Sequence, residues 1–315
     1  MREESKTETG NQQLVEDART AKSSAAVEAV MAAAGRTDFA SRVARTELET
    51  GAVLLALENR ATPTVSLRGS LRAGSYFEPR ARPGLARLVA EMLARGTRRR
   101  TKLEIAESLE GAGAELEFSA DPFAVNVAGR CLAEDLPAVT GTLAEMLREP
   151  SFPADELEKL KQQQIAAVRE QQSNTRVRAY EKFSQLVYQP ENPFYTHAGE
   201  RLIESIAATT VEDVRRLYEE RYGGRSLILS VVGDVSAEEV GEKFRESFGG
   251  FPGPESVEIS VTDPEQSQGC REIVVVREKA NVDVLLGTSA PLRRDALPPD
   301  TRAVQFIGSR VACAR

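Results

Sequence analysis

The hydrophobic positions between residues 39 and 250 follow two spacings in turn, one typical of strands and one typical of helices. Ala52–Leu57 and Val65–Leu71 are short apolar or alternating runs bounded by glycine, asparagine and proline, which predicts a pair of adjacent strands. Residues 83–96 place apolar side chains at i, i+3, i+4, i+7 and i+8 between a proline and a glycine. This spacing predicts a helix with one apolar face.

The same two spacings continue as far as Phe248. A capping box, Thr210 followed three residues later by Asp213, marks the start of one helix. The predicted order of elements indicates an α+β fold, with a layer of helices on one face of a largely antiparallel sheet. The further predicted strands are Glu115–Ser119, Phe123–Gly129 and Leu227–Gly233, and the further predicted helices are Lys102–Glu110, Glu134–Leu147, Ala154–Val187, Thr210–Tyr222 and Ala237–Phe248.

The pattern divides the chain into three regions. Residues 1–38 are rich in alanine, serine, glutamate and lysine without a strand pattern, which indicates a linker or a disordered extension. Residues 39–250 make up the main domain. Residues 251–315 begin at a glycine- and proline-rich hinge, and about 60 residues are too few to enclose a core of their own, so we expect the start of a truncated second domain. Its predicted elements are the strands Glu272–Val276 and Val282–Gly287 and a helical start near Thr301.

The charge and composition exclude several classes of protein. The chain has 41 Lys and Arg against 48 Asp and Glu, and a net charge of −7 argues against a general nucleic-acid binder. No run approaches the roughly 20 apolar residues of a membrane span. The polar N-terminus lacks the apolar segment of a signal peptide. We therefore expect a soluble protein, and the choice between cytoplasm and periplasm stays open.

Few residues offer metal or nucleophilic chemistry. His197 is the one histidine of the chain, which excludes any site that needs two histidines from it. We interpret His197 as a loop residue. Cys131, Cys270 and Cys313 are widely spaced and odd in number, which indicates isolated thiols rather than a disulfide framework. Arg98–Arg100 is interpreted as a solvated run of cations.

Residues 84–97, which read GLARLVAEMLARGT, resemble the zinc-binding helix of the M16 metallopeptidases, which reads like G-L-A-H-F-L-E-H-M-L-F-K-G-T. This family includes pitrilysin, insulinase and the mitochondrial processing peptidase. The resemblance implies a LuxS/MPP-like fold, in which helices cover one face of a largely antiparallel sheet, followed by a second domain of the same type. Further segments resemble family motifs in the same order: Ser70–Pro79, Leu109–Phe118, Pro190–Tyr195, Val231–Val235 and Asp283–Pro291.

The resemblance also identifies the positions at which the family holds zinc. Arg87 stands at the first histidine, Ala90 at the general-base glutamate and Glu91 at the second histidine. Ala166 or Ala167 stands at the third ligand, a glutamate on a later helix. Arginine has no lone pair to donate, alanine has no donor atom, and one carboxylate cannot hold zinc. We therefore expect no catalytic residue, no metal ligand and no cofactor in this chain.

What remains at these positions is an i, i+4 pair, Arg87 and Glu91. The simpler interpretation is an ion pair on the helix surface that contributes about 0.3–0.5 kcal/mol. The alternative is a brace that fills the vacated metal site. In M16 proteins a peptide substrate adds as a strand to the sheet edge near the metal. The candidate peptide-binding edge here is the strand that carries Val65, Leu67, Gly69 and Leu71.

M16 proteins consist of two similar halves, and commonly one half carries the zinc. The resemblance thus implies a non-catalytic subunit or half that pairs with a zinc-bearing M16 partner to form a peptide-binding and proteolytic chamber. Zinc is then expected only on that partner. Two alternatives stay open. One is an active metallopeptidase with displaced ligands, and the other is an assembly subunit like the core proteins of the respiratory bc1 complex.

Overall fold

The computed structural model describes residues 39–254, 257–261, 272–279 and 282–287. The chain divides into two units, Met1–Ala44 and Arg45–Arg315. The 3-10 helix η1 (Phe39–Arg42) belongs to the first unit, and the sections below concern the second. The extension, the helical start near Thr301 and two of the three cysteines, Cys270 and Cys313, lie outside the described residues.

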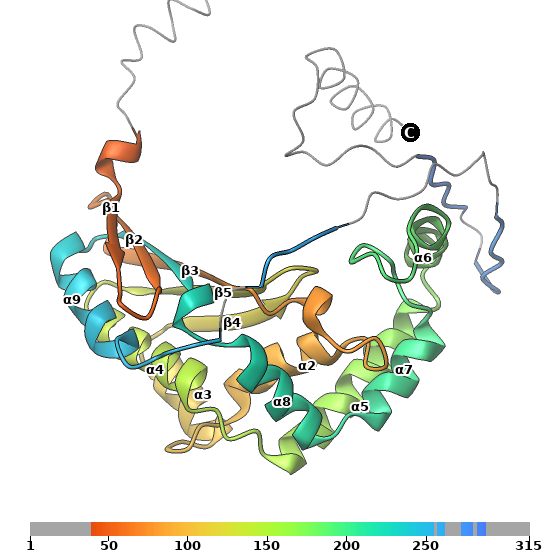
Figure 1. Cartoon of the computed structure of the whole chain (residues 1–315), viewed down its shortest axis with the longest axis horizontal. Helices are drawn as coiled ribbons and strands as arrows, with labels where there is room; N and C mark the ends of the chain where they lie inside the picture. Colours follow the sequence, from red (N-terminus) through yellow and green to blue (C-terminus); the bar gives the residue numbers. More distant parts are fainter. Residues whose placement is uncertain (1–38, 255–256, 262–271, 280–281, 288–315) are drawn as a thin grey trace, which may run out of the picture. The chain divides into compact units, whose positions relative to one another are not determined.

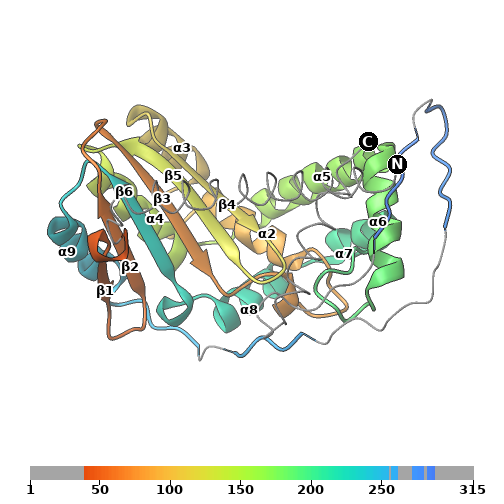
Figure 2. The ribbon, with the colours of Figure 1, turned by 90° about the horizontal axis from the view of Figure 1, so that it is seen from above.

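One mixed six-stranded sheet has the strand order β1-β2-β6-β3-β5-β4 (Figure 2). The pair β2 and β6 is parallel, while β3 is antiparallel to both β6 and β5, and β4 is antiparallel to β5. The two strands predicted as neighbours, β2 and β3, are therefore separated by β6, and that prediction is wrong. The strands are β1 (Ala44–Glu47), β2 (Val53–Glu58), β3 (Thr64–Leu71), β4 (Glu115–Ala120), β5 (Val125–Leu132) and β6 (Ile228–Gly233).

Helices cover one face of this sheet, as Figure 1 shows, and the α+β prediction is confirmed. In β3, for example, Val65 and Leu67 are fully buried against the helices, whereas Ser66 and Arg68 on the opposite face are exposed. The helices are α2 (Leu85–Met92), α3 (Lys102–Gly111), α4 (Leu136–Arg148), α5 (Ala154–Gln171), α6 (Thr175–Val187), α7 (Gly199–Ala208), α8 (Val211–Arg221) and α9 (Ala237–Phe248).

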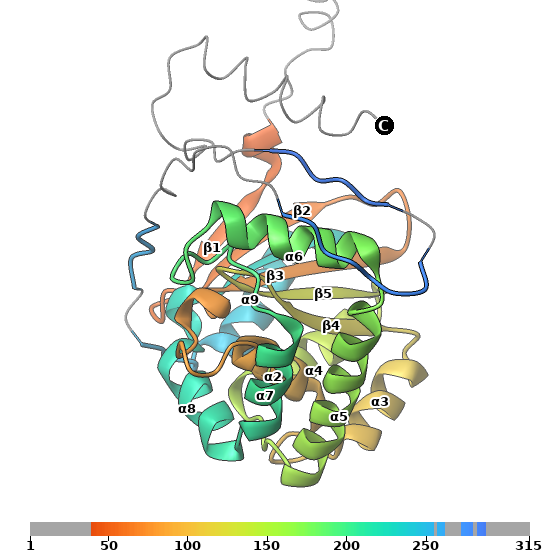
Figure 3. The same ribbon diagram turned by 90° about the vertical axis from the view of Figure 1, so that its right-hand side faces the viewer.

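The helix α6 stands apart from that layer (Figures 1 and 3). The sequence predicted one long helix from Ala154 to Val187, but α5 ends at Gln171. Asn174 starts α6 instead, because its side-chain oxygen accepts hydrogen bonds from the amides of Arg176 and Val177 at 3.0 and 3.2 Å. The helix α7 was not predicted at all. In contrast, the capping box that starts α8 is confirmed.

The candidate peptide-binding edge is not an edge. Val65, Leu67, Gly69 and Leu71 lie on β3, which pairs with β6 on one side and β5 on the other. Both rows of its backbone hydrogen-bonding groups are therefore used within the sheet. The strands at the two ends of the sheet are β1 and β4. The prediction is wrong because β6, more than 150 residues later in the chain, inserts beside β3.

The prediction of two strands near the C-terminus is also wrong. Glu272–Val276 and Val282–Gly287 are described, and neither segment forms a strand there. Their assignment to a second domain stays a prediction. Within the described part of the chain, no helix combines the length and the apolar character that crossing a bilayer requires.

Candidate functional site

The helix α2 carries the segment that resembles the zinc helix of the M16 family, and it packs against β4, α5 and α8. Its N-cap, Gly84, has a φ of 90°, and a Cβ there would lie 2.8 Å from Leu202. Glycine is therefore required at the entry to the helix. All positions of α2 except two are buried, which leaves Arg87 and Glu91 on its accessible flank.

The N-terminus of α2 is held by Glu78, which follows the 3-10 helix η2 (Ser75–Phe77). One carboxylate oxygen accepts the amide of Gly84 at 3.0 Å, and the other accepts the amide of Ala86 at 2.9 Å. Two amides that lack partners within the helix are thus satisfied. Burial raises the pKa of Glu78 to about 7, although these backbone hydrogen bonds favour its ionised form.

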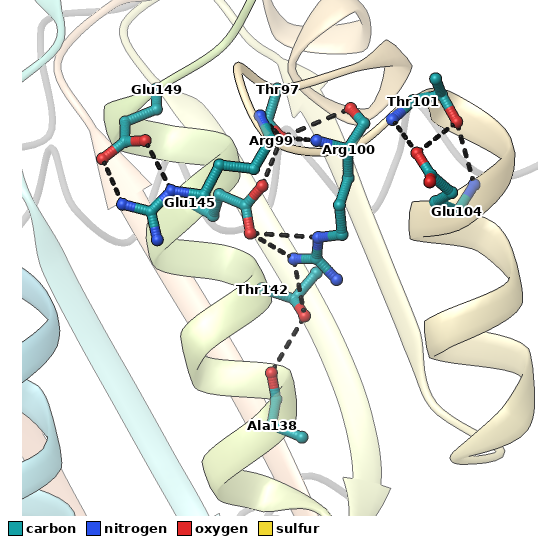
Figure 4. Close-up of polar contacts among 9 residues, drawn as sticks. All are labelled: Thr97, Arg99, Arg100, Thr101, Glu104, Ala138, Thr142, Glu145 and Glu149. Carbon is teal, nitrogen blue, oxygen red and sulfur yellow. Dashed lines mark hydrogen bonds and ion pairs between the residues drawn. The ribbon is translucent and has the colours of Figure 1, made fainter.

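The other end of α2 continues as the 3-10 helix η3 (Leu93–Arg95) and stops at Gly96, whose φ is 141°. The next turn is anchored to α4 (Figure 4). The Thr97 hydroxyl donates to Glu145, and the Arg100 guanidinium donates to the same carboxylate at 2.6 Å from Nη2 and 3.1 Å from Nε. These contacts attach the C-terminal end of α2 to the helix layer.

The Glu145 carboxylate stays ionised in this setting. Burial opposes its ionisation, but the hydrogen bonds from Arg100 and Thr97 and the charges of Arg100 and Arg99 outweigh burial and lower its pKa. Arg99 makes a separate pair, at 3.1 and 3.2 Å, with Glu149, the C-cap residue of α4 (Figure 4).

The prediction of a solvated run at Arg98–Arg100 is therefore only partly right. The Arg99 side chain is 70% exposed and that of Arg100 is 24% exposed. The Arg100 guanidinium has a second partner as well, because it donates to the Thr142 hydroxyl at 3.3 Å. It is thus a structural cation that links the turn to α4, while Arg98 is exposed.

A third set of contacts joins η3 to α5. Arg95 donates to Glu156 at 3.1 Å and to Gln163 at 2.7 Å, and its charge partner Glu156 is mostly buried. The helix that carries the third-ligand position is therefore tied to the helix that carries the first two. The two helices that carry the degenerate zinc-motif positions of the resemblance therefore contact each other at fixed positions.

The side chains on this frame of two helices carry different chemistry. Arg87 Nε donates to Glu91 Oε1 at 2.8 Å, and the two side chains are 54% and 29% exposed. Ala90, at the general-base position, has 0% exposure, so no side chain there faces a substrate water. On α5, Ala166 is exposed and Ala167 is half-buried at the border of the face that packs inward.

These residues do not fit a zinc ion. A catalytic site needs three neutral or anionic donors that converge at about 2 Å and an open position for water. The frame supplies one carboxylate, Glu91, and that carboxylate is already paired with a guanidinium cation. Among the described residues, no group of three or more His, Cys, Asp or Glu side chains could hold a metal ion.

The remaining candidates lie elsewhere. His197 lies in the loop before α7, with its ring centroid 5.2 Å from that of Tyr195. Burial, followed by the nearby charge of Arg201, lowers the pKa of His197. Cys131 is a buried free thiol in β5, and burial with the charge of Asp135 raises its pKa to about 11. A protonated thiol of this kind is a poor nucleophile.

Among the described strands, the sheet edge near α2 is β4, which pairs there with β5 alone. Its outward side chains, Glu115, Glu117 and Ser119, are exposed, while Leu116 and Phe118 pack into the core. An extended peptide would find unpaired backbone amides and carbonyls along this edge. Figure 2 shows α5, α6 and α7 beyond the β4 side of the sheet.

Sequence reasoning missed Glu78 and Glu145, the two carboxylates that hold the ends of α2. Glu78 lies within Ser70–Pro79, one of the segments that resemble family motifs. Its position six residues before the helix N-cap could have indicated a capping role. Glu145 lies 48 residues after Thr97 in the chain, and no local pattern connects the two.

Two protein-family models match the chain. The model described as insulinase (peptidase family M16) matches residues 54–193, and the model described as the peptidase M16 inactive domain matches residues 208–299. The resemblance found in the sequence is therefore confirmed over most of the described residues.

Three curated proteins illustrate the similarity. An uncharacterized zinc protease from Rickettsia felis is 23% identical over 194 residues, covering 62% of this chain and 47% of the relative. The non-peptidase homolog YmxG of Helicobacter pylori is 22% identical over 198 residues, covering 62% and 45%. The mitochondrial-processing peptidase subunit beta of Bos taurus is 24% identical over 189 residues, covering 60% and 38%. The chain spans about half the length of the curated relatives it matches.

Solved structures show the same fold. A peptidase M16 inactive domain from Pseudomonas fluorescens superposes with a TM-score of 0.64 at 26% identity, covering 71% of this chain and 54% of that one. Pitrilysin superposes with a TM-score of 0.61 at 18% identity, covering 70% of this chain and 24% of that one.

Proposed function

The chain belongs to the M16 peptidase family, and from this premise we propose that it is a non-catalytic member that pairs with a zinc-bearing M16 half or subunit. In the pair, this chain contributes one wall of a chamber that binds extended peptides. Any zinc and the general base belong to the partner. This chain supplies a sheet edge and a helix frame without hydrolytic chemistry.

One observation carries the proposal. Glu78, Glu145 and Arg95 hold α2 and the residues that follow it against their neighbours, which supports the view that the frame of a metal site is kept. The donors within the frame are replaced by an arginine–glutamate pair and by alanines. Proteolysis by this fold requires a polarising metal and a proton acceptor, and the frame offers neither.

The relatives support the same reading. One of the curated relatives is named a non-peptidase homolog, and another is named as a subunit of the mitochondrial processing peptidase. A matching family model and a matching solved structure both carry the description of an inactive M16 domain. Such a chain could take part in proteolysis only where another M16 chain provides the metal, which is why we include the partner in the proposal.

The edge that binds peptide in this proposal is β4 rather than β3. It lies at the end of the sheet, it contacts α2, and its alternate side chains already face outward. Main-chain hydrogen bonds along β4 would hold a peptide whose sequence matters little, and neighbouring surfaces would add preference for particular side chains.

The test combines metal analysis with digestion of an unfolded protein. We expect the purified chain to contain no stoichiometric zinc and to leave the substrate intact. A zinc-bearing M16 chain from the same genome should form a complex with this chain in size-exclusion chromatography. The complex should digest the unfolded protein faster than the zinc-bearing chain does alone. Chelator-sensitive cleavage by this chain alone would overturn the proposal, and so would the failure of the two chains to associate.

A further inference from the structure

Five aromatic side chains form a continuous surface at one end of the sheet. They come from η2, from the β4–β5 turn and from the end of α6 and the loop that follows it. Neighbouring ring centroids are 5.0, 6.1, 5.6 and 5.7 Å apart, distances typical of interacting aromatic pairs. We name this surface the aromatic ledge, and in the order of those distances its members are Phe77, Tyr76, Phe123, Phe194 and Tyr188.

The aromatic ledge is not part of the hydrophobic core. The chain has 6 Tyr, 11 Phe and no Trp, so five aromatic residues in one place are a large share of the total. Phe194 is 38% exposed, and the other four are half-buried. By comparison, Phe244 and Phe248 of α9 are fully buried. Aromatic rings left partly exposed in a cluster are typical of binding surfaces.

The ledge continues the β4 edge. Phe123 follows the last residue of β4, Ala120, after a short turn. Asp121 holds this turn, because its Oδ1 accepts the amides of Phe123 and Ala124 at 2.8 and 2.7 Å. The same carboxylate accepts Asn126 Nδ2 at 2.8 Å. Phe123 therefore stands at a fixed position where a strand paired with β4 would leave the sheet.

The other groups around the ledge also favour an apolar occupant. The guanidinium of Arg221 lies over the ring of Phe77, 5.0 Å from its centroid, and so covers one face of that ring. The Tyr76 hydroxyl donates to the carbonyl of Ser260 at 3.0 Å, so its polar end already has a partner. The accessible part of the aromatic ledge therefore consists mainly of aromatic rings. Such rings bind large apolar and aromatic side chains.

We propose that the aromatic ledge binds a large apolar or aromatic side chain of an extended peptide that pairs with β4. The proposal rests on the proposed peptide-binding function of that edge. It adds a preference for peptides with a large apolar or aromatic side chain, which backbone pairing with β4 does not provide. Backbone pairing along β4 holds the peptide, and the ledge selects peptides that carry such a side chain where the strand ends.

The experiment measures peptide affinity of the full chain by titration calorimetry. The first probe is an eight-residue peptide rich in threonine and valine with a tyrosine at each end, so that either strand direction brings a ring to the ledge. The second probe has alanine in place of both tyrosines. We expect the tyrosine peptide to bind about five-fold more tightly, as an aromatic pair allows.

Two variants locate the preference. Phe123→Leu and Phe194→Leu keep apolar volume but remove a ring, and each should reduce the five-fold preference to about two-fold or less. Leu132→Ala is the matched control, because Leu132 is an exposed apolar residue at the opposite end of β5. It should leave the preference unchanged.

The outcomes separate the two proposals. Equal affinity for both peptides, or a preference that survives in both leucine variants, overturns the role of the ledge and leaves the peptide-binding edge in place. No binding of either peptide by the wild-type chain overturns peptide binding by this chain itself, and the role of the ledge with it. Thermal unfolding of each variant confirms that the fold is retained.

Discussion

The two ends of α2 differ from its accessible flank. Each end is fixed by a carboxylate that is at least half-buried. Glu78, before the helix, accepts two backbone amides, and Glu145, on α4, accepts a hydroxyl and a guanidinium from the turn that follows the helix. The flank carries Arg87 and Glu91, an ion pair whose side chains are 54% and 29% exposed. The ends position the helix, and the flank is where the family's chemistry would lie.

This difference shows that placement and chemistry depend on separate residues. A helix can keep its position while its reactive flank changes, because the groups that hold it face inward or toward its termini. Substitutions at the ends should therefore affect folding strongly, whereas substitutions on the flank should affect folding little and metal binding greatly. The predictions below test that separation, beginning with the largest expected effect.

Glu145→Ala should lower the free energy of unfolding by about 3 kcal/mol. The substitution leaves the mostly buried guanidinium of Arg100 and the buried hydroxyl of Thr97 without their common acceptor. Urea unfolding followed by circular dichroism measures the change.

The matched control for this effect is Arg99→Ala. Arg99 belongs to the same turn and pairs with Glu149 one helical turn away, but it is exposed to solvent. Removing it should cost less than about 1 kcal/mol. Equal losses in the two variants would show that the Arg100–Glu145 contact does not anchor the helix.

Glu78 should make the stability depend on pH. Its pKa is about 7 in the folded protein and close to the ordinary value of 4.5 when unfolded, so the folded state binds its proton more tightly. The contribution of this group to the free energy of unfolding is therefore greatest below pH 4.5 and falls as the pH rises toward 7. Between pH 5 and pH 8 the fall should be about 2 kcal/mol.

The comparison of the wild type with Glu78→Gln isolates this contribution, because glutamine keeps an acceptor oxygen but does not titrate. Urea unfolding at pH 5 and pH 8 should show that the substitution removes the decline. A wild-type protein and a variant with the same pH dependence would show that Glu78 is ionised throughout that range in the folded state.

Arg87→Ala should have the smallest effect, about 0.4 kcal/mol or less. The pair with Glu91 is solvent-exposed, and arginine on the N-terminal side of glutamate is the weaker of the two orientations on a helix. The same unfolding assay at low and high salt measures it. A loss above about 1.5 kcal/mol would favour the alternative that the pair braces the vacated site.

Much of this fold follows from local patterns in the sequence. The helix at Leu85–Met92, the capping box at Thr210 and most other strands and helices between residues 52 and 248 were predicted, because apolar spacing and helix caps depend on near neighbours. The strand β1, the helix α7 and the break between α5 and α6 were not. The assignment of Arg87, Ala90 and Glu91 to degenerate metal-site positions rests on a motif within one helix and stays a prediction.

The errors came from contacts between distant segments. The insertion of β6 between β2 and β3 moved the expected binding edge from β3 to β4, and no pattern within β3 could show this. The role of Glu145 depends on a turn 45 residues earlier in the chain. The break before α6 was different, since Asn174 is a recognisable helix cap that the long apolar pattern obscured.

The central claim, that α2 and α5 keep the frame of a metal site without its donors, is tested most directly by zinc titration. The wild-type chain is compared in one calorimetric experiment with the variant Arg87→His, Glu91→His and Ala167→Glu, which restores three donors at accessible or half-buried positions and leaves buried Ala90 unchanged. We expect one zinc ion to bind the restored variant and none to bind the wild type. Tight one-to-one zinc binding by the wild type, or a folded variant that binds none, would contradict the account.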